Sequence, residues 1–224
     1  MKNLAIICAR KNSQRLKNKN LLKIGDQSLI EMAINSAIKS KQFTDIIISS
    51  DDEKILKLNK KYTKIIFEER KKKLSGSKVR VVEVVLDILN RRNEYDNVAL
   101  LLPTCPFRVA KDINNAFSIF FKNKFNTVSV TNYEFPPELS IFKIKNFYSP
   151  GKKSPLLRHQ TRSQDHNSYL KPNGAIFISP VKRLLKTKNF YNIRMNVYRM
   201  PRERSIDIDT SLDFKIAKFL YERK

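Results

Sequence analysis

The sequence predicts an α/β protein with a mostly parallel sheet and helices on both of its faces. Two observations support this class. Short runs of Ile, Val and Leu alternate along the chain with longer segments in which apolar residues recur at helical spacing. The short runs are continuously apolar, as is typical of strands that are buried on both faces. With 224 residues, the chain is long enough for one such domain.

The expected elements follow from these patterns. The expected strands share an aliphatic core and cover residues 4–8, 46–49, 65–67, 98–102, 127–130, 175–178 and 196–200. The expected helices share apolar residues three or four positions apart and cover residues 29–40, 53–61, 79–91, 111–121 and 210–222. Ser28 and Glu31 have the spacing of a capping box at the start of the first helix. Asp51 and Asp52 are expected to cap the helix that follows the second strand.

This alternation breaks between residues 132 and 171. Prolines punctuate a polar and basic stretch there, and only residues 140–144 have the pattern of a strand. An irregular segment of this length inside a compact domain is usually functional, as a lid or an interaction arm. We therefore predict a single domain, residues 1–224, with residues 132–171 as an insertion.

The charge balance is strongly basic. Lys and Arg number 45 against 21 Asp and Glu, for a net charge of +24. Such a charge suits a nucleic acid, a membrane surface or a phosphate ligand, but lysines scattered among Asn and Ile are also typical of a low-GC codon bias. A nucleic-acid-binding domain would interleave aromatic residues with cations. The Phe residues of 117–121 instead lie in an apolar run and are expected in the core.

The cysteine and histidine content and the hydropathy of the chain exclude further classes of protein. The two cysteines form no CxxC pair and there are two histidines, which argues against a disulfide scaffold and against a metal centre built on these residues. No apolar run approaches the roughly 18 residues of a membrane span, and the first residues lack the pattern of a secretory signal. We expect a cytoplasmic protein with neither a membrane nor a nucleic acid as its partner.

Two places are candidates for chemistry. In open α/β sheets, ligands bind beyond the carboxyl ends of the strands. The loop after the first strand, residues 9–20, combines cations with Asn and Ser and can form either a triphosphate cradle or a solvated basic loop; it matches no P-loop. In residues 205–210, Asp207 and Asp209 share one face of an extended segment and could bind one divalent cation. Asp209 could also cap the last helix.

Four segments carry a family resemblance. Residues 7–20 (ICARKNSQRLKNKN), 101–108 (LLPTCPFR), 171–177 (KPNGAIF) and 205–210 (SIDIDT) resemble, in the same order, the motifs of the acylneuraminate cytidylyltransferases, or CMP-sialic acid synthetases. The resemblance extends over almost the full length. It implies a Rossmann-like fold of the nucleotide-diphospho-sugar transferase type with an irregular dimerisation arm, and hence a homodimer.

The resemblance also implies a reaction and its residues. CTP and an acidic nine-carbon 2-keto sugar would give the CMP-sugar and pyrophosphate, with Mg²⁺ as cofactor. By motif position, CTP would bind Arg10, Asn12, Ser13, Lys19, Asn20 and Arg70, the metal Asp207 and Asp209, and the sugar Leu102, Arg162, Lys171 and Asn173. Of these, Arg10, Lys19, Arg162 and Asp209 would act directly in catalysis.

The departures from the family motifs lie on the sugar side. Leu102 stands where many relatives have a glutamine, and Ser163 stands where an arginine is expected beside Arg162. The sugar therefore stays open between sialic acid and legionaminic, pseudaminic or 3-deoxy-manno-octulosonic acid. A catalytically silent relative and a basic nucleic-acid-binding domain are the alternatives of another class.

Overall fold

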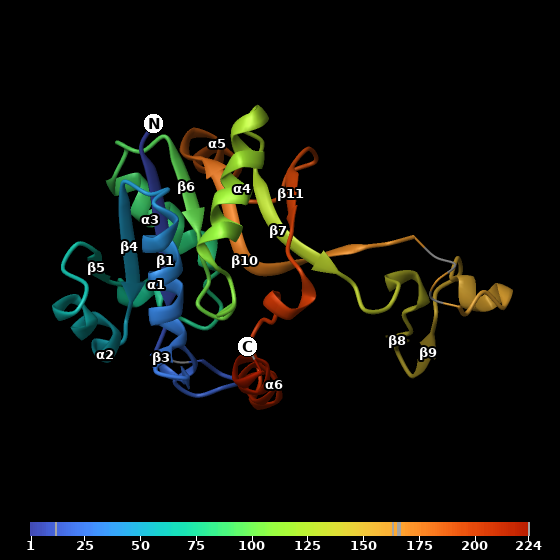
Figure 1. Cartoon of the computed structure of the whole chain (residues 1–224). Helices are drawn as coiled ribbons and strands as arrows, with labels where there is room; N and C mark the ends of the chain where they lie inside the picture. Colours follow the sequence, from blue (N-terminus) through green and yellow to red (C-terminus); the bar gives the residue numbers. More distant parts are fainter. Residues whose placement is uncertain (12, 163, 165–166, 224) are drawn as a thin grey trace. The chain divides into compact units, whose positions relative to one another are not determined.

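A computed structural model describes residues 1–11, 13–162, 164 and 167–223 (Figure 1). The chain divides into two compact units, a larger one of residues 1–130 with 173–224 and a smaller one of residues 131–172. The described part holds no helix that is long and apolar enough to cross a membrane.

A seven-stranded sheet forms the centre of the larger unit, in the order β11-β7-β10-β6-β1-β4-β5. Its strands are β1 (Asn3–Ala9), β4 (Asp45–Ser50), β5 (Ile66–Glu69), β6 (Asn97–Leu100), β7 (Thr127–Asn132), β10 (Leu170–Pro180) and β11 (Asn196–Arg199). Strands β4, β1 and β6 run parallel, as do β4 with β5 and β7 with β11, whereas β10 is antiparallel to β6. The prediction of a mostly parallel sheet is confirmed.

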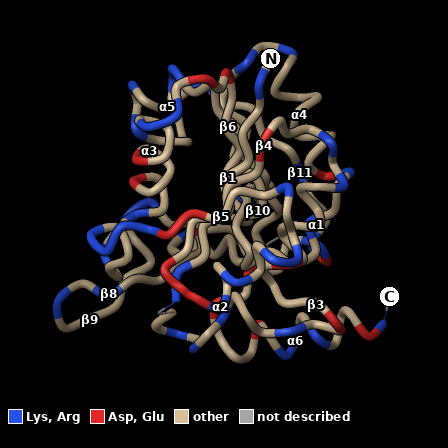
Figure 2. Tube along the Cα trace, turned by 90° about the vertical axis from the view of Figure 1, so that its left-hand side faces the viewer, with Lys and Arg blue, Asp and Glu red and all other residues tan. Residues whose placement is uncertain are grey.

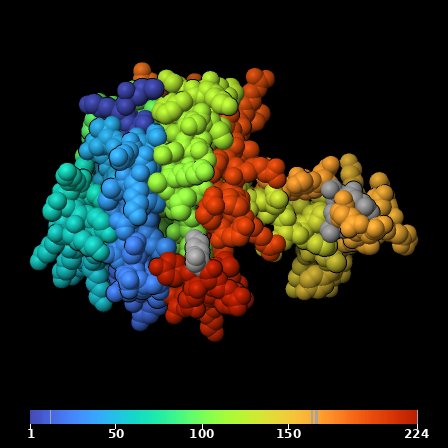
Figure 3. All heavy atoms as spheres, viewed as in Figure 1, coloured from blue at the N-terminus to red at the C-terminus, as the bar shows by residue number. Residues whose placement is uncertain are grey.

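Helices cover both faces of this sheet. The helices of the larger unit are α1 (Leu29–Ser40), α2 (Glu53–Leu56), α3 (Val81–Arg91), α4 (Ala110–Asn123), α5 (Val181–Thr187) and α6 (Ser211–Glu222). Helices α1 and α4 pack on each other over one face, and α3 and α5 pack together over the other (Figures 1 and 2). In the space-filling view, blue α1 and yellow-green α4 lie side by side (Figure 3). The strands between these two helix layers are buried, with Ile6 and Ile48 fully inaccessible.

Local sequence explains where several helices begin. Helix α1 has the predicted bounds, and Ser28 and Glu31 form the predicted capping box, in which the Ser28 N–H donates to the Glu31 carboxylate at 3.0 Å. Asp52 caps α2, accepting from the Lys54 N–H at 2.9 Å, as predicted. Helix α2 is shorter than expected because the chain tightens into a 3₁₀ turn at Lys57–Lys60. Helix α5 was not predicted.

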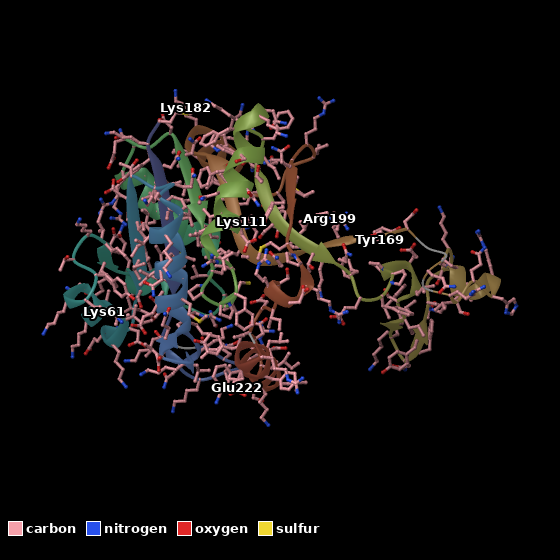
Figure 4. The ribbon with its side chains drawn as sticks, viewed as in Figure 1. Lys61, Lys111, Tyr169, Lys182, Arg199 and Glu222 are labelled. Carbon is pink, nitrogen blue, oxygen red and sulfur yellow. The ribbon has the colours of Figure 1, made fainter. Side chains whose placement is uncertain are left out.

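The smaller unit contains the hairpin of β8 (Phe142–Ile144) and β9 (Phe147–Ser149). Where the chain enters and leaves this unit, the Tyr133 N–H donates to the carbonyl of Tyr169, which is labelled in Figure 4. The unit leaves large apolar side chains exposed, among them Phe135, Ile141 and Tyr148. The dimerisation role expected for residues 132–171 stays a prediction.

Candidate active site

A pocket of about 340 Å³ lies where β1 and β6 end. One wall is the first loop, which we define as residues 10–20, and another is the stretch from Arg70 to Val84. The predicted site residues that line the pocket are Arg10, Ser13, Lys19, Asn20, Arg70, Leu102 and Asp209. The structure thus brings together residues from four distant parts of the sequence at the edge where ligands of open α/β sheets bind.

Two cations of the first loop reach the same carboxylate. The Lys19 Nζ lies 2.8 Å from Asp209 Oδ1, and the Arg15 Nη2 lies 2.8 Å from Asp209 Oδ2. The Lys19 side chain is 13% exposed and that of Arg15 is 68% exposed. Both side chains line the pocket, Lys19 as a mostly buried cation inside it and Arg15 as an exposed cation at its rim.

The rest of the first loop is held by backbone contacts. The Asn20 side chain donates to the Arg10 carbonyl at 3.0 Å, which ties the two ends of the loop together. The Asp51 carboxylate accepts from the Lys11 N–H at 2.7 Å. Asp51 was expected to cap α2 beside Asp52; this expectation is wrong, because its carboxylate holds the loop instead. Asn12, a predicted nucleotide contact, lies outside the described residues.

Arg70 and Cys8 lie at the floor of the pocket. The Arg70 guanidinium is buried and donates to the Ser49 carbonyl at 2.7 Å and to its hydroxyl at 3.3 Å. Burial raises the pKa of the Cys8 thiol to about 11, against the opposing effect of the positive Arg70. Cys8 was not predicted as a pocket residue, although its place at the carboxyl end of the first strand was a usable signal.

Asp209, which lines the pocket, belongs to an extended stretch of residues 205–209 that we call the aspartate segment. The Ile208 N–H donates to the Thr104 carbonyl at 2.9 Å, which joins this segment to the turn after β6. Gly174 on β10 has φ +75°, and a Cβ there would lie 3.4 Å from Cys105 Sγ and 3.5 Å from Asp207 Oδ2. Those distances are ordinary van der Waals contacts, so a glycine suits this position because of its positive φ, which L residues with a Cβ rarely adopt.

The two aspartates of the segment differ in environment. The pKa of Asp207 is raised because surrounding protein atoms partly desolvate its carboxyl and because Asp209 lies nearby, while a hydrogen bond from Thr104 acts in the opposite direction. The carboxylate of Asp209 instead faces the Lys19 and Arg15 cations. Two neighbouring carboxylates that repel each other fit a shared divalent cation, since Mg²⁺ commonly takes one or two carboxylates together with phosphate oxygens and water.

Asp209 does not cap the last helix. Thr210 is the N-cap of α6 and forms a capping box with Asp213, whose carboxylate accepts from the Thr210 N–H at 2.7 Å. The prediction of a capping role for Asp209 is therefore wrong, because a Thr at the N-cap and an Asp three positions later satisfy the same donors. Among the described residues, no three His, Cys, Asp or Glu side chains gather to hold a metal by themselves.

The predicted sugar-side residues are not found together in one unit. Leu102 lines the pocket. Asn173 is buried, and its amide is bonded to Ser129 and Ser205. Arg162 and Lys171 belong to the smaller unit, and their contact with the sugar stays a prediction.

Solved structures of related architecture show which fold the protein has. CMP:2-keto-3-deoxy-manno-octonic acid synthetase complexed with CTP is similar with a TM-score of 0.73 and 14% identity, covering 100% of this chain and 99% of that one. The 4-diphosphocytidyl-2C-methyl-D-erythritol synthase of Anaerococcus prevotii is similar with a TM-score of 0.67 and 15% identity, covering 100% and 96%. Identities this low show the fold.

The family model for cytidylyltransferases matches residues 4–223, and the chain belongs to this family. It is 31% identical over 229 residues to the pseudaminic acid cytidylyltransferase of Campylobacter jejuni, covering 99% of this chain and 97% of the relative. It is 31% identical over 227 residues to the N-acylneuraminate cytidylyltransferase of Escherichia coli, covering 99% of this chain and 52% of the relative. The CMP-N,N'-diacetyllegionaminic acid synthase of Legionella pneumophila is 29% identical, covering 99% and 97%. The predicted family and enzyme class are confirmed.

Proposed function

We propose that the protein transfers CMP from CTP to a nine-carbon acidic 2-keto sugar, with release of pyrophosphate. The observation that carries this proposal is the pocket itself, which is lined by Arg10, Lys19, Arg70 and Asp209. Support comes from relatives that match nearly the whole chain and are named for pseudaminic, N-acylneuraminic and diacetyllegionaminic acids.

The cations of the pocket suit the triphosphate of CTP. Arg10, Lys19 and Arg70 place positive charge beside a ligand that carries several negative charges, and Ser13 adds a hydroxyl. In the reaction the anomeric hydroxyl of the sugar attacks the α-phosphorus, and pyrophosphate leaves from the opposite side. Catalysis of this kind consists mainly of positioning and charge stabilisation. The proposed role of Lys19 and Arg10 is to stabilise the charge of the leaving pyrophosphate.

Cytidylyltransferases generally use a divalent metal, and we propose Mg²⁺ with Asp207 and Asp209 as its ligands. Asp207 and Asp209 would hold the ion, which would supply positive charge to the phosphates and help to lower the pKa of the attacking hydroxyl. Asp209 also pairs with Lys19 and Arg15, so the same carboxylate places these two cations at the site.

Leu102, Arg162 and Lys171 are the proposed contacts of the sugar. Leu102 offers an apolar surface in the pocket. Arg162 and Lys171 would attract the carboxylate of the sugar. The proposal includes a homodimer formed through residues 132–171 and a cytoplasmic location, where CTP is made.

The charge distribution does not favour nucleic-acid binding. Lys and Arg are spread around the larger unit (Figure 2). Lys111 lies on α4 and Lys182 on α5, whereas Lys61 lies in the loop between α2 and β5 (Figure 4). Phe117 and Phe120 are buried instead of being presented for stacking on bases.

A pyrophosphate-release assay tests the proposal. CTP, ATP, GTP and UTP are each offered with sialic, legionaminic, pseudaminic and 3-deoxy-manno-octulosonic acids. We expect turnover that requires CTP and is fastest with one of the nine-carbon acids. Equal turnover with ATP, or no turnover with any acid, would contradict the proposal.

A further inference from the structure

A fully buried carboxylate lies beside the start of the aspartate segment. Asp112, in the first turn of α4, is 0% exposed. It accepts from Arg204 Nη2 at 2.7 Å and Nε at 3.2 Å, from the Tyr198 hydroxyl at 2.8 Å and from the Val109 N–H at 2.9 Å. These donors on both carboxylate oxygens compensate the loss of water. Asp112 therefore ties Arg204, which immediately precedes the aspartate segment, to the beginning of α4.

A buried amide holds the next residue. Asn173 is 4% exposed, and its Nδ2 donates to the Ser205 hydroxyl at 2.9 Å. Its Oδ1 accepts from the Ser129 hydroxyl at 2.6 Å and from the Ala175 N–H at 3.2 Å. Both ends of the amide are thus used within the protein, and Ser205 is connected to β7 and β10.

Asp112 holds Arg204 and Asn173 holds Ser205. These two adjacent residues lie three and two positions before Asp207. The chain then reaches the Thr104 carbonyl through the Ile208 N–H, so the segment is held on both sides of Asp207. A stretch without regular secondary structure has few backbone partners of its own. Its direction is therefore set by these buried contacts.

We propose that Asp112 and Asn173 are positioning residues, which fix the start of the aspartate segment and thereby orient Asp207 and Asp209 toward the metal. This inference rests on the proposed function for the identity of that metal. It gives Asn173 a different role from the sugar contact that its motif implied.

The first test uses Asp112→Asn, which keeps the size of the side chain and removes its charge. Partners that orient metal ligands typically contribute 10–100-fold to metal affinity. We expect Mn²⁺, used as a paramagnetic substitute and followed by electron paramagnetic resonance, to bind roughly 10-fold more weakly. We expect the Mg²⁺ concentration for half-maximal pyrophosphate release to rise by a similar factor, with turnover at saturating metal changing much less.

Ser205→Ala is a milder second variant, because it removes the acceptor of Asn173 at a partly exposed position. Asn126→Ala is the matched control, since Asn126 is also buried and its amide bonds the Phe190 carbonyl and the Ser179 hydroxyl, away from the aspartate segment. The control should lose thermal stability and keep the metal affinity of the parent protein. A loss of stability in Asp112→Asn and Ser205→Ala with unchanged Mn²⁺ affinity would overturn the inference.

Amide hydrogen exchange separates this inference from the proposed function. The Ile208 N–H should exchange faster in Asp112→Asn and Ser205→Ala than in the parent and in Asn126→Ala. Unchanged exchange at Ile208 overturns the positioning role even where the parent is an active cytidylyltransferase. An inactive parent contradicts the proposed function, and the exchange and Mn²⁺ measurements still decide the positioning role.

Discussion

The first loop and the aspartate segment line the same region of the protein but are held in different ways. The loop depends on exposed or partly exposed contacts, such as the Arg15 ion pair, whose arginine is 68% exposed. The aspartate segment depends on Asp112 and Asn173, which are 0% and 4% exposed. Exposed ion pairs contribute about 0–1 kcal/mol, whereas the Asp112–Arg204 pair joins a fully buried carboxylate to an arginine that is only 31% exposed. We infer that the first loop, the proposed phosphate-binding side, adjusts to its ligand while the aspartate segment, the proposed metal-binding side, is preformed.

The largest expected effect on turnover comes from removing Lys19, the mostly buried cation of the first loop. Lys19→Ala should reduce turnover by roughly 10²-fold or more, the scale of losing one preorganised charge contact in the transition state. Arg10→Ala should act similarly. Lys17→Ala is the matched control, because Lys17 is exposed in the same loop and is not among the pocket residues. Steady-state pyrophosphate release measures all three, and near-normal rates in Lys19→Ala and Arg10→Ala would refute their roles.

Asp209→Asn tests the segment at its pocket end. Asn is a weaker ligand for a hard cation, so we expect a turnover loss approaching 10²-fold and a higher Mg²⁺ requirement. Because Thr210 caps α6, Asp209→Asn should keep the helix cap and lose stability only through its ion pairs with Lys19 and Arg15, about 1 kcal/mol or less for each. Thr210→Ala should show the opposite pattern, with about 1 kcal/mol lost from stability and turnover retained. Full activity of Asp209→Asn at low Mg²⁺ would remove Asp209 from the metal site.

Arg15→Ala tests how much the first loop depends on its exposed ion pair. Its ion pair with Asp209 is solvated, so its removal should cost less than about 1 kcal/mol of stability. Turnover should fall only a few-fold, far less than for Lys19→Ala. A loss as large as that of Lys19→Ala would show that the rim arginine closes onto the substrate, and the distinction between rim and pocket would fail.

The smallest expected effect is on how the free energy of unfolding changes with pH. The raised pKa of Asp207 means that the folded protein binds this proton more tightly than the unfolded chain does. Protonated Asp207 therefore contributes to the free energy of unfolding. This contribution is fully present below the ordinary pKa of an aspartate and is lost as the pH rises through the raised pKa. Asp207→Asn stays neutral at every pH, so its melting temperature should exceed that of the parent at pH 7 and approach it in acid. An equal or lower melting temperature at pH 7 would contradict this.

The sequence predicts best what short-range patterns determine. Helix α1 has the expected bounds because apolar spacing and the Ser28 capping box agree. Helix α5 was missed because its seven residues after Pro180 are too short to show a period. The loop after β1 could be placed at the pocket, since strand ends in such sheets share one edge. The capping role of Asp209 was wrong because Thr210 was an equally good cap one position later.

No pattern in the sequence predicts the buried hydrogen-bond network around Asp112. Asp112 looks like an ordinary acidic residue in the first turn of a helix, and Arg204 looks like one of many cations. Their pairing depends on how α4 packs against a segment that lies 92 positions further along the chain. Contacts of this kind follow from the tertiary fold, which local periodicity does not determine.

The two native thiols have a practical consequence for labelling. Cys8 has a pKa of about 11, and burial raises the pKa of Cys105 further still. Since the thiolate is the reactive form, both should react slowly with maleimides at neutral pH. A cysteine introduced at an exposed position of the first loop, such as Lys17→Cys, could then carry a fluorophore or spin label with both native cysteines left in place. Such a probe would report directly on loop motion as nucleotide is added.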